Sequence, residues 1–193
     1  MISPTLLPVP LDRAYRLLNH GPVTLVSSAH AGRDDVMAAA WAMPLDFMPP
    51  KVVVIIDRST FTRTLVEASG EFVLNIPSSA QAAAVLAAGS GSGREQADKI
   101  AACGLQRLPA ERVGAPRIAG CLGWLECRVL PEPENQRQHD LFIAEVVAAQ
   151  ADARVFRDGR WQFAPEGGLR TLHYVAGGAF LETGRSITVE APR

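Results

Sequence analysis

The sequence has few lysines and no basic run. Only Lys51 and Lys99 are lysine, and the 19 basic residues are nearly balanced by 20 acidic ones. A surface that binds nucleic acid needs clustered positive charge. The composition therefore argues against a nucleic-acid partner.

Cysteine is also scarce. Cys103, Cys121 and Cys127 are odd in number and have no CxxC spacing, which excludes both a disulfide framework and a zinc site of the usual kind. The histidines offer no metal-ligand spacing either. We expect no metal site, and thiols that stay reduced in a cytoplasmic protein.

Long hydrophobic runs are missing. No apolar stretch approaches the roughly 20 residues of a membrane-spanning helix. Residues 1–10 lack the positive start and apolar core of a signal peptide. We expect a soluble protein with no membrane partner.

The 193 residues, of which 48% are hydrophobic, suit one domain, residues 1–193, with residues 1–10 as an extended arm. Short β-branched runs bounded by Gly and Pro predict strands, and alanine-rich or capped stretches predict helices. Strands are expected at 23–29, 36–42, 52–56, 71–76, 121–130, 141–149 and 179–181. Helices are expected at 11–20, 62–69, 80–88 and 94–103, with a hairpin turn at 32–34 and a mobile loop at 131–138. Many strands and few long helices predict a mainly β fold, a barrel with peripheral helices.

Small residues next to a tryptophan mark the first candidate site. The segment is Met37, Ala38, Ala39, Ala40 and Trp41. Short side chains let a flat ligand approach the backbone, whose N–H and C=O groups can pair with its polar edge. A plain buried strand has a similar pattern, so the segment alone does not decide between a ligand site and a buried strand.

A hydroxyl cluster with a basic residue follows about twenty residues later. It consists of Asp57, Arg58, Ser59, Thr60 and Thr62. Hydroxyls and guanidinium groups bind phosphate, and the first amides of a helix favour an anion. We expect Thr62 to cap the helix that follows, which leaves Arg58 and Ser59 as the favoured phosphate contacts. The alternative is that Thr62 only caps the helix and Arg58 is a solvated surface charge, with no phosphate bound.

Seven motifs in one order resemble those of the flavin reductase-like family. They are Val-Met-Ala-Ala-Ala-Trp (36–41), Pro-Pro (49–50), Arg-Ser-x-Phe-Thr (58–62), Gly-Glu-Phe-Val-Leu-Asn-Ile-Pro (70–77), Ser-Gly-Arg-x-x-x-Asp-Lys (92–99), Leu-Glu-Cys (125–127) and His-x-Leu-Phe-Ile-x-Glu-Val (139–146). Each motif is short, but the likeness runs from about residue 23 to residue 180.

This resemblance implies an FMN-binding split β-barrel, six-stranded, antiparallel and of Greek-key topology. It also implies a homodimer with the flavin near the subunit interface. By the same resemblance, residues 37–41 run along the isoalloxazine ring and residues 57–62 bind the phosphate. Ser92 and Lys99 lie near the flavin or the pyridine nucleotide, and His139 lies on the nicotinamide or substrate side of the ring. Asn75, a polar side chain in an apolar strand, pairs either with the flavin or with a neighbouring loop.

Three positions depart from the family's pattern. Asp35 stands where the family usually has Asn, Gln138 replaces an Asp, and Ala144 replaces a Gly. An ionised Asp35 cannot donate a hydrogen bond to a flavin. Glu126 is expected to be structural and to pair with a basic group such as Arg128.

The favoured hypothesis is an FMN-dependent oxidoreductase that takes hydride from NAD(P)H. Electrons would pass on to free flavin, a ferric chelate or a partner monooxygenase. The alternatives are a non-catalytic FMN-binding electron-transfer protein of the flavoredoxin type, and a split barrel that has lost its flavin. The sequence has no dinucleotide-binding motif that would separate them.

Overall fold

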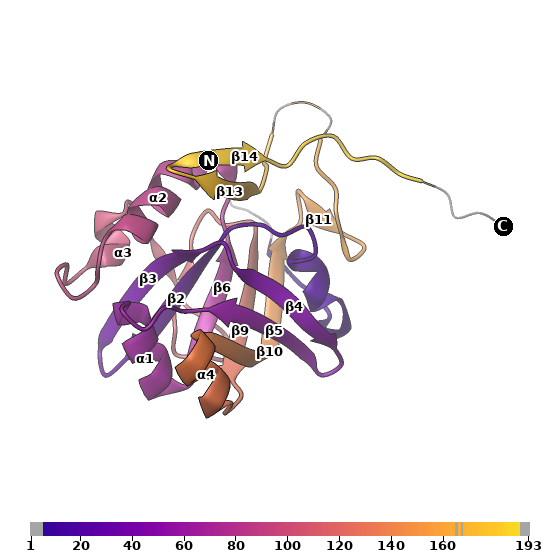
Figure 1. Ribbon diagram of the computed structural model, residues 1–193. Coiled ribbons are helices and arrows are strands. Elements are labelled where there is room, and N and C mark those ends of the chain that lie inside the picture. Colours follow the sequence, from indigo (N-terminus) through magenta and orange to yellow (C-terminus); the bar gives the residue numbers. More distant parts are fainter. Residues whose placement is uncertain (1–5, 165, 167, 190–193) are drawn as a thin grey trace.

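A large antiparallel sheet organises the computed structural model, which describes residues 6–164, 166 and 168–189 (Figure 1). Its strands are β1 (Leu6–Pro8), β2 (Thr24–His30), β3 (Arg33–Ala39), β4 (Ala42–Phe47), β5 (Pro50–Ile55), β6 (Glu71–Ile76), β9 (Gly123–Val129) and β10 (Leu141–Asp152). They pair in the order β3-β2-β6-β9-β10-β5-β4, and β1 adds to β10. The fold is mainly β with peripheral helices, as the sequence predicts.

The sheet has eight strands rather than the six expected. Two strands account for the difference: the short β1, and β4, which follows β3 after a break at residues 40–41. The sequence shows a single run at 36–42 because apolar residues continue across this break. The β2–β3 hairpin turns one residue earlier than expected, at Ala31 and Gly32, whose φ angles are 49° and 76°.

Helices cover the ends and one face of the sheet (Figure 1). They are η1 (Leu11–Leu17), α1 (Phe61–Ser69), η2 (Ser79–Gln81), α2 (Ala82–Ser90), α3 (Lys99–Ala102) and α4 (Pro133–His139). Three short hairpins complete the fold: β7 (Arg107–Leu108) with β8 (Arg117–Ile118), β11 (Phe156–Arg157) with β12 (Arg160–Trp161), and β13 (Leu172–Ala176) with β14 (Ala179–Glu182). No helix in the described part of the chain is long and apolar enough to cross a membrane.

Two apolar cores lie on opposite faces of the curved sheet. One fills its concave side and includes Val54, Leu74 and Phe142, all nearly fully buried. The other includes Leu25 and Trp124 and packs under helices α2 and α3. Because alternate residues of a strand face opposite sides, two-sided packing buries both faces of the central strands. This arrangement is the barrel with outer helices that the sequence predicts.

One loop prediction and one helix prediction are wrong. The loop expected at 131–138 is largely helix α4, with Pro133 in its first turn and a left-handed Asp140 at its end. Its surface is polar all round, so no apolar stripe announced it. The helix expected at 94–103 is only α3, because the Asp98 carboxylate accepts a hydrogen bond from the Ala101 amide and caps a new start.

Glu126 is structural, but its expected partner is wrong. Its buried carboxylate accepts hydrogen bonds from the Glu111 amide at 2.9 Å and the Arg112 amide at 2.6 Å. Arg128 instead contacts Glu71 at 3.4 Å. Residues two apart in a strand point to the same face, so Glu126 and Arg128 share a face of β9. Arg128 lies near the end of the strand, however, where it is exposed and Glu126 is buried.

Candidate functional site

Helix α1 begins one residue after Thr60, not after Thr62. The Thr60 hydroxyl oxygen accepts a hydrogen bond from the Arg63 amide at 3.2 Å, and Gly70 ends the helix with φ of 70°. Thr62 is fully buried and its hydroxyl donates to Asp35 Oδ2 at 2.8 Å. The prediction that Thr62 caps this helix is therefore wrong, since three neighbouring hydroxyl residues offered equivalent caps in sequence.

The start of α1 opens into a cavity of about 340 Å³. Its walls come from β3, from residues 59–62, from the end of α2 with residues 88–92, and from Glu95 and Lys99. The Phe61 and Thr62 amides belong to the first turn of the helix, where amides have no partner within the helix. They therefore favour an anion at this end of the cavity.

A buried ion pair lies beside these amides. Lys99 is 3% exposed and Asp35 1% exposed, and Lys99 Nζ lies 3.9 Å from Asp35 Oδ1. Burial lowers the pKa of the Lys99 ammonium below its ordinary value of 10.5, and the charge of Asp35 works against that shift. Asp35 Oδ1 is buried with no hydrogen-bond partner among the described residues. An unpaired acceptor and an ammonium thus face one cavity.

Gly93 is required by the close packing at Asp35. A Cβ atom there would lie 2.5 Å from Asp35 Oδ1 and 2.8 Å from the Phe61 ring. The Ser-Gly-Arg segment therefore closes over the ion pair as only glycine allows.

A second cavity, of about 430 Å³, continues from the first along the end of β3. Residues 37–41 line one side, together with Ile55 and Asp57, and the other side is Tyr174 and Val175 of β13. A smaller cavity of about 190 Å³ adjoins it under the β13–β14 hairpin, and Ala38 lines all three. The three cavities form one elongated groove, apolar at one end and polar at the other.

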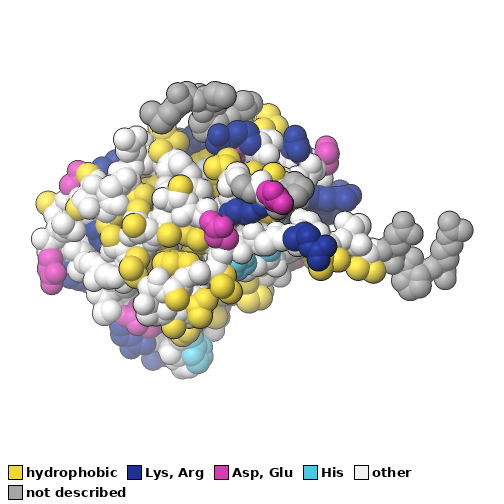
Figure 2. Space-filling model, turned by 90° about the horizontal axis from the view of Figure 1, so that it is seen from above, with side chains coloured by type: hydrophobic (Ala, Val, Ile, Leu, Met, Phe, Trp, Pro, Cys, Tyr) yellow, Lys and Arg dark blue, Asp and Glu magenta, His cyan; other side chains and the backbone are white. Residues whose placement is uncertain are grey.

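Small side chains are necessary in this groove. Gly89 faces Ala38 so closely that a Cβ atom on Gly89 would lie 3.3 Å from the Ala38 Cβ. Trp41 is 75% exposed at the groove's apolar end. Figure 2 looks down on the β13–β14 side of the molecule, where hydrophobic side chains gather in the middle of the face.

The turn before α1 is held rigid by its own hydrogen bonds. Asp57 Oδ1 accepts from the Ser59 amide at 2.8 Å and from the Ser59 hydroxyl at 2.6 Å. These two bonds lower the pKa of the Asp57 carboxyl, which stays ionised. Ser59 and Thr60 line the polar cavity, and so does Ser92, whose hydroxyl accepts from the Arg94 amide at 3.2 Å.

Three predicted site residues do not line the groove. Arg58 donates to Asp140 at 3.2 Å and to the Arg137 carbonyl at 3.0 Å, so its guanidinium joins the turn before α1 to the end of α4. His139 is exposed at the end of α4.

Asn75 is the third, and it is fully buried. Its amide donates to the Leu25 carbonyl and the Ser27 hydroxyl at 2.8 and 2.9 Å, and its oxygen accepts from the Ile118 amide at 2.7 Å. Of the two roles left open, Asn75 therefore has the structural one, because its side chain has no free group for a ligand.

Two arginines lie beside the groove: Arg33, which the sequence reasoning missed, and Arg94, which belongs to the motif at 92–99 but had no assigned role. The guanidinium groups of Arg33 and Arg94 lie over the Phe61 ring, 4.4 and 5.6 Å from its centroid. Arg33 also donates to the Gly93 carbonyl at 2.9 Å, and Arg94 donates to the Thr64 hydroxyl at 3.1 Å. They add positive potential near the start of α1. No local pattern could reveal that Arg33 lies over Phe61, since it is distant in sequence from α1.

Redox or metal chemistry by side chains has little support in the described residues. The three cysteines are free, and burial raises the pKa of the Cys121 and Cys127 thiols, which keeps them protonated. No group of three or more His, Cys, Asp or Glu side chains within the described part of the chain is placed to hold a metal ion.

Residues 16–176 match the model of the flavin reductase like domain, and the chain belongs to this family. Its fold is the split barrel of that family. A solved FMN-binding domain of a flavin reductases-like enzyme from Shewanella baltica OS155 is 46% identical, with a TM-score of 0.95 and coverage of 98% of this chain and 100% of that one.

Two curated relatives extend the comparison. Uncharacterized protein YddH of Escherichia coli K12 is 43% identical over 94% of this chain and 97% of its own length. The reductase component of a 4-nitrophenol 4-monooxygenase/4-nitrocatechol 2-monooxygenase from Rhodococcus opacus is 31% identical over 74% of each chain.

Proposed function

We propose that this protein binds FMN in the groove and acts as an NAD(P)H-dependent flavin reductase. The observation that carries the proposal is the continuity of a narrow apolar half with a polar half that ends at a helix N-terminus and a buried lysine. FMN has the same division, a flat ring joined by a ribityl chain to a phosphate.

The phosphate end is assigned to the start of α1. The hydroxyls of Ser59 and Thr60, the amides of Phe61 and Thr62, and the Lys99 ammonium line one cavity. The amides and the ammonium supply the donors to a dianion, because the Ser59 hydroxyl already donates to Asp57 Oδ1 and the Thr60 hydroxyl to the Asp57 carbonyl. Ser92 borders the same space, as does Asp35, whose Oδ1 lies 3.9 Å from Lys99 Nζ.

The ring end is assigned to residues 37–41. Small side chains there admit a planar ring against the backbone, and Tyr174 and Val175 cover its other side. When bound, FMN supplies the hydride and electron-transfer chemistry. The chain's own residues hold and orient it and limit the access of water, and no side chain need act as an acid or nucleophile.

A homodimer is part of the proposal. Edge strand β4 and its flanks expose Trp41, Met43, Leu45, Phe47 and Met48 in one continuous stretch. Exposed apolar edges of this kind invite pairing with another chain. A second copy seated there would also shelter the ring end of the groove, since Trp41 belongs to both. Ultracentrifugation tests this: Met43→Glu with Phe47→Glu should give monomers, whereas Val189→Glu in the exposed tail should not.

The decisive experiment is an absorbance titration of the purified protein with FMN, followed by NADH and NADPH. We expect a bound flavin spectrum that either nucleotide bleaches, and nucleotide consumption when free FMN or a ferric chelate is added. Failure to bind FMN would refute the proposal. Binding without nucleotide oxidation would instead support a non-catalytic electron-transfer protein.

An electron-accepting partner and a role for His139 are two further parts of the proposal. A monooxygenase as electron acceptor is supported by the likeness to the Rhodococcus reductase component. Use of pyridine nucleotides would place the activity in the cytoplasm. His139 stays a prediction: NADH oxidation by His139→Ala at saturating FMN tests it, and an unchanged rate would remove it from the site.

A further inference from the structure

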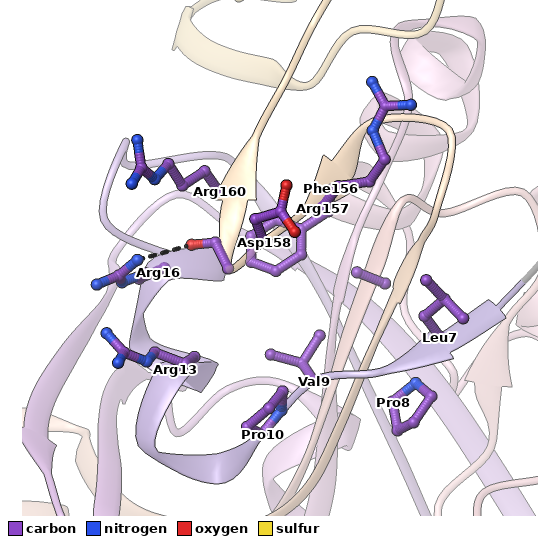
Figure 3. A pocket seen from close by; sticks show the side chains of 12 residues that line it. Leu7, Pro8, Val9, Pro10, Arg13, Arg16, Phe156, Arg157, Asp158 and Arg160 are labelled. Carbon is purple, nitrogen blue, oxygen red and sulfur yellow. Dashed lines mark hydrogen bonds between the residues drawn. The ribbon is translucent and has the colours of Figure 1, made fainter.

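A separate cavity of about 490 Å³ lies between helix η1, strand β1 and the β11–β12 hairpin (Figure 3). None of its lining residues lines the groove described above. Neither the family resemblance nor the proposed function assigns a role to this cavity.

The walls of this cavity are firmly built. The β11–β12 turn is an Asp-Gly pair with left-handed φ angles, 52° at Asp158 and 67° at Gly159, as a tight hairpin requires. Arg16 Nη1 donates to the Gly159 carbonyl at 3.2 Å and joins η1 to this turn. On the opposite side the Val9 amide donates to the Ala149 carbonyl at 2.8 Å, which fixes the segment after β1.

The cavity is strongly basic. Arg13 and Arg16 come from η1, and Arg157 and Arg160 come from the hairpin, against a single lining carboxylate, that of Asp158 (Figure 3). Of these, Arg13 has a further carboxylate neighbour, Asp12, at 3.3 Å. Figure 3 shows the guanidinium groups of Arg13, Arg16 and Arg160 on one side of the cavity, and that of Arg157 pointing away from them. Guanidinium groups gathered in this way attract and bind phosphate through paired N–H donors.

The floor is apolar. It consists of Val9, Ala151 and Phe156, which are buried, with Leu7 and two prolines at the edge. The volume lies in the range of small-molecule pockets, about 300–1,000 Å³, and is far larger than one phosphate needs. The ligand should therefore join an organic part to more than one anionic group.

We propose that this cavity binds a nucleoside diphosphate or triphosphate. The phosphates contact Arg13 and Arg160, and the base and sugar rest on the apolar floor, where guanidinium planes can stack on a flat ring. The proposal does not depend on flavin binding, because the two sites share no residue.

Calorimetric titration of the full chain with ADP, in the presence of excess FMN, tests the proposal. The test variant is Arg13→Gln with Arg160→Gln, both exposed positions, so the fold should survive. The control is Arg112→Gln with Arg185→Gln, which removes the same charge from exposed positions elsewhere. Pyrophosphate is the second probe, because it carries the phosphates without the organic part.

We expect ADP to bind wild type and control alike, at least tenfold more weakly to the test variant, and more weakly at high salt. ADP should also bind at least tenfold more tightly than pyrophosphate. No binding of ADP at millimolar concentration, or equal loss in the control, would overturn the site. Equal affinity for pyrophosphate and ADP would overturn the assignment to a nucleotide.

Discussion

The ion pair of Asp35 and Lys99 gives the sharpest test of the proposed phosphate end. Lys99→Met alone would leave the Asp35 carboxylate buried without a cation, at a cost of about 3–5 kcal/mol in folding free energy. The change is therefore best made together with Asp35→Asn. That amide keeps the acceptor for the Thr62 hydroxyl and removes the charge. Asp35→Asn alone is the matched reference; because it leaves the buried Lys99 ammonium without its anion, it too is destabilised, and both variants are compared by the FMN affinity of the folded protein.

The expected loss follows from the position of the ammonium. A charge-assisted hydrogen bond to phosphate contributes about 1.5–3 kcal/mol, or a factor of roughly 10–150 in the dissociation constant. The FMN dissociation constant of Asp35→Asn with Lys99→Met should rise by that factor over the reference. Riboflavin, which lacks the phosphate, should bind both variants within about threefold. Quenching of flavin fluorescence measures both ligands.

The pH dependence provides a second readout. The lowered pKa of Lys99 brings its loss of charge below the ordinary value of 10.5. Only the protonated form attracts the phosphate, so FMN affinity of the wild type should fall as the pH rises through that lowered pKa. The variant lacking Lys99 should show no such fall. Equal weakening of riboflavin and FMN would refute the placement of Lys99 at the phosphate.

Three further changes test the packing and electrostatics around the groove. Gly93→Ala places a methyl group 2.5 Å from Asp35 Oδ1, so the melting temperature should fall by the equivalent of about 1–3 kcal/mol and FMN affinity should fall with it; an unchanged protein would contradict the close packing. Asn75→Ala leaves the Ile118 amide unpaired and should cost about 2–4 kcal/mol in urea unfolding, with FMN affinity of the folded protein unchanged. Burial lowers the pKa of His20 from 6.5 to about 4, so the unfolded chain binds more protons in that window. The free energy of unfolding should therefore fall by up to about 3 kcal/mol as the pH drops from 6.5 to 4, and by less in His20→Gln. Unfolding measured at a series of acid pH values would test this.

Local chemistry explains what could be predicted. Gly70 ends α1, the Asp-Gly pair at 158–159 makes a tight turn, and the apolar run at 71–76 forms a buried strand, each from residues adjacent in sequence. The order of the family motifs identified the fold and brought residues 37–41 and 59–62 to one site. These signals need no knowledge of what packs against them.

The sequence by itself determined the family, the strand pattern and the two ends of the candidate site. Only the tertiary structure decided that Asp35 pairs with Lys99 and Thr62, that Arg33 and Arg94 flank Phe61, and that Arg58 points away to α4. It also brought the arginines of η1 to those of the β11–β12 hairpin. The reason is that turns and caps depend on neighbouring residues, whereas a charge in a folded protein takes its partner from strands and helices far along the chain.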